Sequence, residues 1–174
     1  MRMTLENGEI TKAGDYDTWT FKDAFRKYFN VVQYYGTVGA TGMGGDDENG
    51  DYDMYKMESY RTYNLKSTAS TNRLDDGQFL VNDGTFYIIE NSGVSKDQIF
   101  ISVDVNGLRK GPNAWGHDLF TFQLTTGGKV IPMGAEGTYY DDLDTYCSPT
   151  SSNKENGIAC TYRALYDNNF WKEL

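Results

Sequence analysis

The segment from Val103 to Phe120 holds the residues of this chain that are best suited to bind a metal ion. Its short oxygen-bearing side chains are Asp104, Asn106, Asn113 and Asp118, and its glycines allow main-chain carbonyls to converge. Calcium takes about six to eight such oxygens at roughly 2.3–2.6 Å. The spacing does not match an EF-hand loop, because alignment on Gly107 puts Ser102 at the first ligand position. On spacing alone we favour a loop held by Asx-turns, with Asp118 as its cap, and keep a calcium site as the alternative.

The other chemistry that the sequence offers is sparse. Acidic clusters at residues 46–53 and 141–144 each favour a solvated loop over a metal site. With His117 as its one histidine, the chain cannot form an HExxH site, and it contains neither a GxSxG nor a GxGxxG motif. A pair of carboxylates that catalyses glycoside hydrolysis is compatible with the sequence, because 25 acidic residues form many pairs. We expect no enzyme, with a hydrolase as the minor alternative.

Cys147 and Cys160 are the two cysteines, and they lie in a polar segment rich in serine and asparagine. A pair is too few for a zinc site, and His117 is far away in the sequence. We favour a disulfide, which would be worth about 3 kcal/mol for a loop of this size. The alternative is two unpaired thiols in a reducing compartment, and a disulfide would indicate an oxidising one.

The composition excludes several classes of function. The chain has 16 Lys+Arg and 25 Asp+Glu, a net charge of −9, and it lacks a basic run, which disfavours nucleic acid and anionic membrane surfaces as partners. Aromatic residues make up 15% of the chain, enough burial to disfavour disorder. Tyrosine-rich stretches at residues 34–35, 52–63 and 139–140 could form a carbohydrate- or protein-binding surface, although ordinary packing beside a sheet explains most of them.

The elements that must position these residues are one helix and a run of hairpins. Residues 18–35 place aromatic and aliphatic side chains at spacings of three, four and seven, which predicts an amphipathic helix that ends at Gly36. From residue 78 the period becomes two, which predicts strands at 78–81, 85–89, 98–105, 119–124 and 129–132 with turns such as Asn82-Asp-Gly84. Helical spacing returns after Glu155 and predicts a short closing helix. We expect one α+β domain over residues 1–174, with the N-terminal helix packed on an antiparallel sheet.

In this combination the chain resembles the soluble C-terminal region of type IV pilin-like proteins, including the pseudopilins of type II secretion systems. The motifs that carry the resemblance are Phe25-Arg-Lys-Tyr-Phe-Asn30, Asp76-Gly-Gln-Phe-Leu80, Asn82-Asp-Gly-Thr-Phe86, Val103-Asp-Val-Asn-Gly107, Gly111-Pro-Asn113, Gly116-His-Asp-Leu-Phe-Thr-Phe122, Val130-Ile-Pro-Met-Gly134, Asn156-Gly-Ile-Ala-Cys160 and Leu165-Tyr-Asp167. The resemblance covers most of the chain from about residue 18, and the block from Asp104 to Phe120 is its most specific part.

The resemblance implies a structural subunit that polymerises into a periplasmic pseudopilus or a surface filament and catalyses no reaction. It also implies a pilin-like roll, in which a long N-terminal helix packs on the sheet. Some members bind calcium in a loop of the C-terminal sheet region, which here corresponds to Asp104, Asn106 and Asp118, with Asn113 as an auxiliary ligand. Many pilins have a disulfide near the C-terminus, which would fit the two cysteines.

The start of the chain departs from the pilin pattern. Pilin-like proteins begin with a leader and about 20 apolar residues that anchor them in the inner membrane and later pack in the filament core, and nothing of that kind precedes Glu6. We expect a fragment that is monomeric by itself, and a full-length protein at the periplasm or cell surface that contacts other pilin-like subunits through the missing helix. The alternative is a secreted, adhesin-like module that binds carbohydrate or protein.

Overall fold

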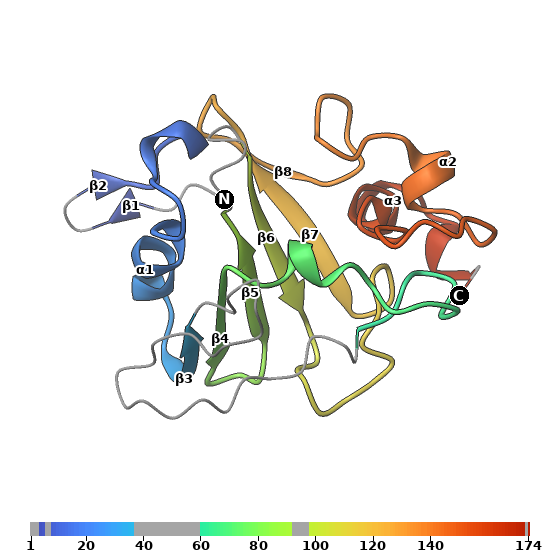
Figure 1. Cartoon of the computed structure of the whole chain (residues 1–174), viewed down its shortest axis with the longest axis horizontal. Helices are drawn as coiled ribbons and strands as arrows, with labels where there is room; N and C mark the ends of the chain where they lie inside the picture. Colours follow the sequence, from blue (N-terminus) through green and yellow to red (C-terminus); the bar gives the residue numbers. More distant parts are fainter. Residues whose placement is uncertain (1–3, 6–7, 37–59, 92–97, 173) are drawn as a thin grey trace.

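The fold centres on one antiparallel sheet of six strands, seen in a computed structural model that describes residues 4–5, 8–36, 60–91, 98–172 and 174. The strands are β3 (Val31–Gly36), β4 (Gly77–Val81), β5 (Phe86–Glu90), β6 (Ile99–Asp104), β7 (Leu119–Leu124) and β8 (Val130–Pro132). They pair in chain order, so that every strand lies beside its sequence neighbours (Figure 1). The connections from β4 to β5, from β5 to β6 and from β7 to β8 are short, which favours antiparallel pairing because a parallel crossover would need a dozen or more residues. Residues 37–76 separate β3 from β4, and residues 105–118 separate β6 from β7.

The strands from β4 to β8 lie where the two-residue period predicts them. The turn between β4 and β5 contains Gly84 at a φ of 92°, a left-handed conformation that glycine adopts without steric cost. The edges of the sheet are irregular: the pairing of β3 with β4 contains two register shifts, and β8 is short and ends at Pro132.

In the described part of the chain no helix is long and apolar enough to cross a bilayer.

The predicted helix over residues 18–35 is wrong. The segment forms a five-residue helix, α1 (Phe21–Phe25), then a 3₁₀ turn, η2 (Arg26–Tyr28), and then the strand β3. The apolar spacing was compatible with a helix, but the β-branched and aromatic residues of 31–36 gain more by pairing with β4, where Tyr34 lies opposite Phe79. The pilin-like roll with a long N-terminal helix packed on the sheet is therefore not the fold of this chain.

The two faces of the sheet are covered by opposite ends of the chain, as Figure 1 shows with the blue segment on one side and the orange and red segment on the other. One face carries a core of Phe79, Val81, Ile89, Ile99, Ile101 and Leu124, against which Ala13, Phe21 and Phe25 pack. The other face carries Phe86, Ile88, Phe100 and Leu119, against which Tyr60, Leu74, Trp115, Met133 and Ile158 pack.

The C-terminal segment contains α2 (Leu143–Tyr146), α3 (Cys160–Tyr166) and the 3₁₀ turn η5 (Phe170–Lys172). The predicted disulfide between Cys147 and Cys160 is confirmed and joins the end of α2 to the start of α3. The remaining elements are β1 (Thr4–Leu5), β2 (Gly8–Glu9), η1 (Ala13–Asp15) and η4 (Thr71–Arg73). The C-terminal segment also contacts the sheet, because the main-chain amide of Thr121 in β7 donates a hydrogen bond to the hydroxyl of Thr161 in α3.

Candidate functional site

The loop between β6 and β7 brings together all four residues that the sequence singled out. Asp104 ends β6 and Asp118 immediately precedes β7, so the two carboxylates lie at the same end of two paired strands. Both are almost fully buried, at 0% and 3% exposure. Asn106 and Asn113 lie in the loop between them and are half-buried.

The Asp104 carboxylate holds the first turn of the loop. Its Oδ1 accepts hydrogen bonds from the main-chain amides of Gly107 at 2.8 Å and Asn106 at 3.2 Å, and its Oδ2 accepts the hydroxyl of Tyr60 at 2.7 Å. Burial raises the pKa of Asp104 above the ordinary aspartate value, and these hydrogen bonds oppose that rise. The first half of the loop is thus an Asx-turn fixed to the segment that carries Tyr60.

The Asp118 carboxylate holds the second half of the loop. Its Oδ1 accepts the amide of Ala114 at 2.7 Å, and its Oδ2 accepts the amide of Asn113 at 2.8 Å and the side-chain amide of Asn106 at 3.3 Å. The same side chain therefore caps the loop and connects its two halves. This arrangement is the loop of Asx-turns and main-chain hydrogen bonds that the spacing favours.

Two other side-chain oxygens in the loop accept no hydrogen bond from the described residues. The side-chain carbonyls of Asn106 and Asn113 are buried, and neither has a hydrogen-bond partner within the described residues. A buried acceptor without a donor costs about 1–3 kcal/mol. These two neutral oxygens and two carboxylates are the donor types that calcium prefers, so the residues present fit a hard cation.

The other sequence candidates are placed apart from this loop. Asp142 caps α2, its carboxylate accepting the amides of Asp144 and Thr145 at the surface. The cluster at 46–53 lies outside the described residues. Among the tyrosines, Tyr60, Tyr63 and Tyr140 are buried in packing, as expected of residues beside a sheet, whereas Tyr139 is half exposed.

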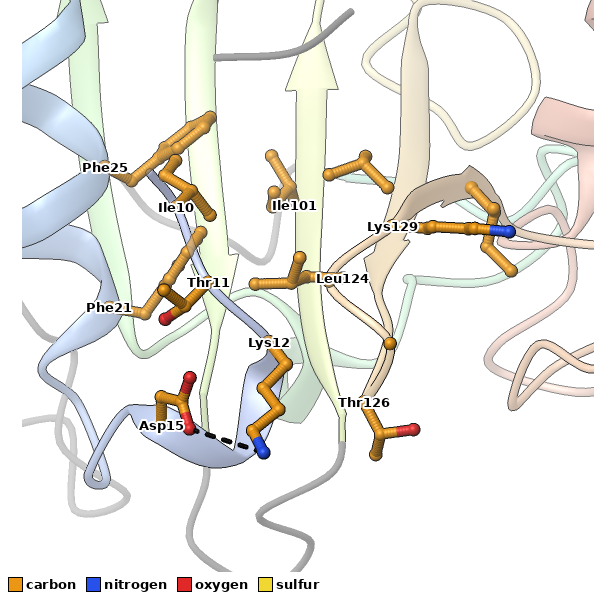
Figure 2. A pocket seen from close by; sticks show the side chains of 14 residues that line it. Ile10, Thr11, Lys12, Asp15, Phe21, Phe25, Ile101, Leu124, Thr126 and Lys129 are labelled. Atoms are coloured by element: carbon orange, nitrogen blue, oxygen red, sulfur yellow. Dashed lines mark ion pairs between the residues drawn. The ribbon is translucent and has the colours of Figure 1, made fainter. Parts of the chain in front are cut away.

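A second feature, which the sequence did not reveal, is a groove of about 830 Å³ on the sheet face that carries Ile101 and Leu124. Figure 2 shows Phe21 and Phe25 of α1 on one side of it and the β7–β8 hairpin, with Lys129, on the other. Val130 on this hairpin is half exposed. The groove could not be predicted because segments more than a hundred residues apart form it.

A third feature is a group of carboxyls, Asp75, Asp76 and Glu90, whose oxygens all lie within 4.8 Å of one another. The sequence contains a usable signal for it: the turn at Asn82-Asp-Gly84 fixes the hairpin register, which brings residue 76 close to residue 90.

Comparison of the chain with models of protein families, with curated proteins and with solved structures found no match.

Proposed function

We propose that the chain is the soluble part of a structural filament subunit, of the pseudopilin or pilin-like kind, and that it catalyses no reaction. The observation that carries the proposal is the role of the two carboxylates in the β6–β7 loop, Asp104 and Asp118. This loop is the most specific part of the resemblance, and both of its carboxylates serve to fix main-chain amides and Tyr60. A carboxylate that acts as a general base or nucleophile needs an oxygen that faces substrate, whereas these oxygens face the protein.

A rigid, cross-linked head fits the demands on a filament subunit. The disulfide between Cys147 and Cys160 holds the C-terminal segment together and is typical of a protein of the periplasm or cell surface. Full-length subunits would be anchored in the inner membrane before assembly and contact one another through an apolar N-terminal helix. The groove beside Val130 combines apolar side chains with charged ones such as Lys12 and Lys129, a lining that suits an amphipathic helix of another subunit.

Calcium belongs to the same proposal. It would be held by Asp104, Asn106, Asn113 and Asp118, where it would satisfy the two unpartnered amide oxygens and offset the two carboxylate charges. Thermal unfolding of the chain in millimolar calcium and in chelator tests this, because an ion at 100 times its Kd stabilises a protein by about 2.7 kcal/mol. The replacement Asp104→Ala should abolish the shift and the exposed Asp141→Asn should keep it. Identical unfolding in calcium and in chelator would rule out the calcium site.

Cross-linking in cells tests the filament. Val130 and Val105 are valines of similar exposure, 50% and 55%, but only Val130 lines the groove. In cells that carry the native gene, Val130→Cys should form oxidised multimers and Val105→Cys should stay monomeric. Monomers from both variants would contradict the proposal. So would a native gene that encodes an ordinary cleavable signal upstream in place of an apolar helix.

One observation favours the binding-module alternative. Tyr162, Tyr166 and Trp171 are exposed near the C-terminus, and the rings of the two tyrosines are 5.1 Å apart. Flat exposed rings are typical of surfaces that stack on sugars or contact proteins. Binding to a glycan array that disappears in Tyr166→Ala and Trp171→Ala would support this function, and an array without signal would remove it.

A further inference from the structure

The groove between α1 and the β7–β8 hairpin has accessible apolar side chains on its outer wall (Figure 2). Its floor consists of side chains of the sheet core, among them Leu124, which is completely buried. Its outer wall is the hairpin, where Val130 is half exposed and Ile131 is half-buried. A partner that enters the groove removes these two side chains from water, and the burial of apolar surface favours its binding.

Two contacts join the hairpin to the N-terminal segment and so fix the shape of the groove. The main-chain amide of Ala13 donates to the carbonyl of Thr125 at 3.2 Å. Gly128 lies so close to the N-terminal segment that a Cβ placed on it would be 3.8 Å from the main-chain nitrogen of Lys12. The main chains that carry Lys12 and Lys129 therefore meet at one border of the groove. Because the groove is already formed, a partner binds without the entropic cost of ordering it.

The border of the groove carries an excess of positive charge. The charged residues that line the groove are two lysines, Lys12 and Lys129, and one aspartate, Asp15, which gives a net charge of +1. The ion pair between Lys12 and Asp15 is 3.9 Å long and its side chains are 58% and 42% exposed, so it contributes little to stability. Lys129 is exposed and forms no ion pair with any of the described residues. Both ammonium groups can therefore receive a carboxylate from a partner.

The charge of this border is opposite to the charge of the whole chain. The chain has a net charge of −9, so two copies repel one another once their surfaces come within the Debye length of about 8 Å at physiological ionic strength. A contact that places the cations of one copy against carboxylates of the next reduces this repulsion, steers association and fixes the register of the two copies. An acidic copy of the same chain therefore complements the groove in charge.

We propose that the groove receives an amphipathic helix of another copy of this protein whose apolar stripe is bordered by aspartate or glutamate. The apolar stripe packs on Val130 and Ile131, and the carboxylates of its border lie beside Lys12 and Lys129. An amphipathic helix has this pattern because polar and charged residues flank its apolar face. The inference rests on the proposed function, since it names the chemistry of a contact between subunits of the filament.

Photo-cross-linking in cells that carry the native gene tests the contact. Benzoylphenylalanine in place of Val130 should capture the occupant of the groove as a dimer of this protein, and mass spectrometry should locate the link in a helix bordered by acidic residues. Reversal of both charges by Lys12→Glu and Lys129→Glu should lower the yield of this dimer by about fivefold or more. Lys12→Arg with Lys129→Arg should keep the yield, because both positive charges remain.

The matched control is Lys66→Glu, which reverses an exposed lysine that does not line the groove and should leave the yield unchanged. Circular dichroism of the purified chain should show that each variant is folded. The inference is overturned if the captured partner is a different protein, or if the folded double reversal gives as much dimer as the parent. Formaldehyde-linked multimers in cells without the photo-cross-linked dimer overturn this inference alone. Cells that yield no multimers with either reagent contradict the proposed function as well.

Discussion

Removal of the Asp118 carboxylate should destabilise the protein more than removal of any single surface acid. In Asp118→Ala the main-chain amide of Ala114, which is fully buried, loses its acceptor at 2.7 Å. The amide of Asn113 loses its acceptor at 2.8 Å. A buried donor left without a partner costs about 1–3 kcal/mol, so the two amides together predict a loss of about 4 kcal/mol.

Urea unfolding in chelator measures this loss with any contribution of bound ion removed. With a slope of about 2 kcal/mol per molar urea, a loss of about 4 kcal/mol lowers the midpoint by about 2 M. Asp118→Asn, which keeps one oxygen, should lose about half as much. The control is Asp83→Ala, because Asp83 accepts one amide, that of Thr85, at an exposed turn and should cost less than about 1 kcal/mol. Equal midpoints for Asp118→Ala and Asp83→Ala would refute the assignment of Asp118 as the residue that holds the loop.

Three other outcomes can be measured by thermal or pH-dependent unfolding. Replacing both Cys147 and Cys160 by alanine should cost about 3 kcal/mol, because the bridge spans 13 residues, and calorimetry should show Tm falling by about 6–12 °C. Gly157→Ala should cost more than about 3 kcal/mol in circular dichroism melts, because its φ is 113° and a Cβ there would lie 2.5 Å from the Cβ of Trp115; a loss below 1 kcal/mol would contradict this. In chelator, stability should fall as pH rises from about 4 to 6, because the folded state raises the pKa of Asp75 from 3.8 to about 6 and so binds its proton more tightly than the unfolded chain. Asp75→Asn should make this slope shallower, and Asp76 and Asp104, whose pKa values are also raised, should supply the rest.

The hairpins could be predicted from the sequence because their signals are local. Asn82-Asp-Gly84 requires positive φ at Gly84, and alternation on both sides of it fixes which residues face the core. The loop residues were found for the same reason: Asp104 and Asp118 bond to amides within five residues of themselves.

The N-terminal segment could not be predicted in this way because its structure depends on distant partners. Phe21 and Phe25 do lie one helical turn apart in α1, but the pattern cannot show that the chain leaves the helix before Val31. Strand β3 exists because β4 offers it hydrogen-bond partners more than forty residues later in the chain. Similarly, the contact of Tyr60 with Asp104 and the floor of the groove join residues whose proximity no local pattern encodes.

The irregular borders of the sheet have a consequence for self-association. One border strand, β3, is broken by two register shifts, and the other, β8, has three residues and ends in a proline that has no N–H to donate. Neither offers the long flat row of free amides and carbonyls on which a foreign strand can add. Copies of this protein should therefore join through side chains and not by extending one another's sheet, and concentrated solutions should not develop the fluorescence of amyloid-binding dyes.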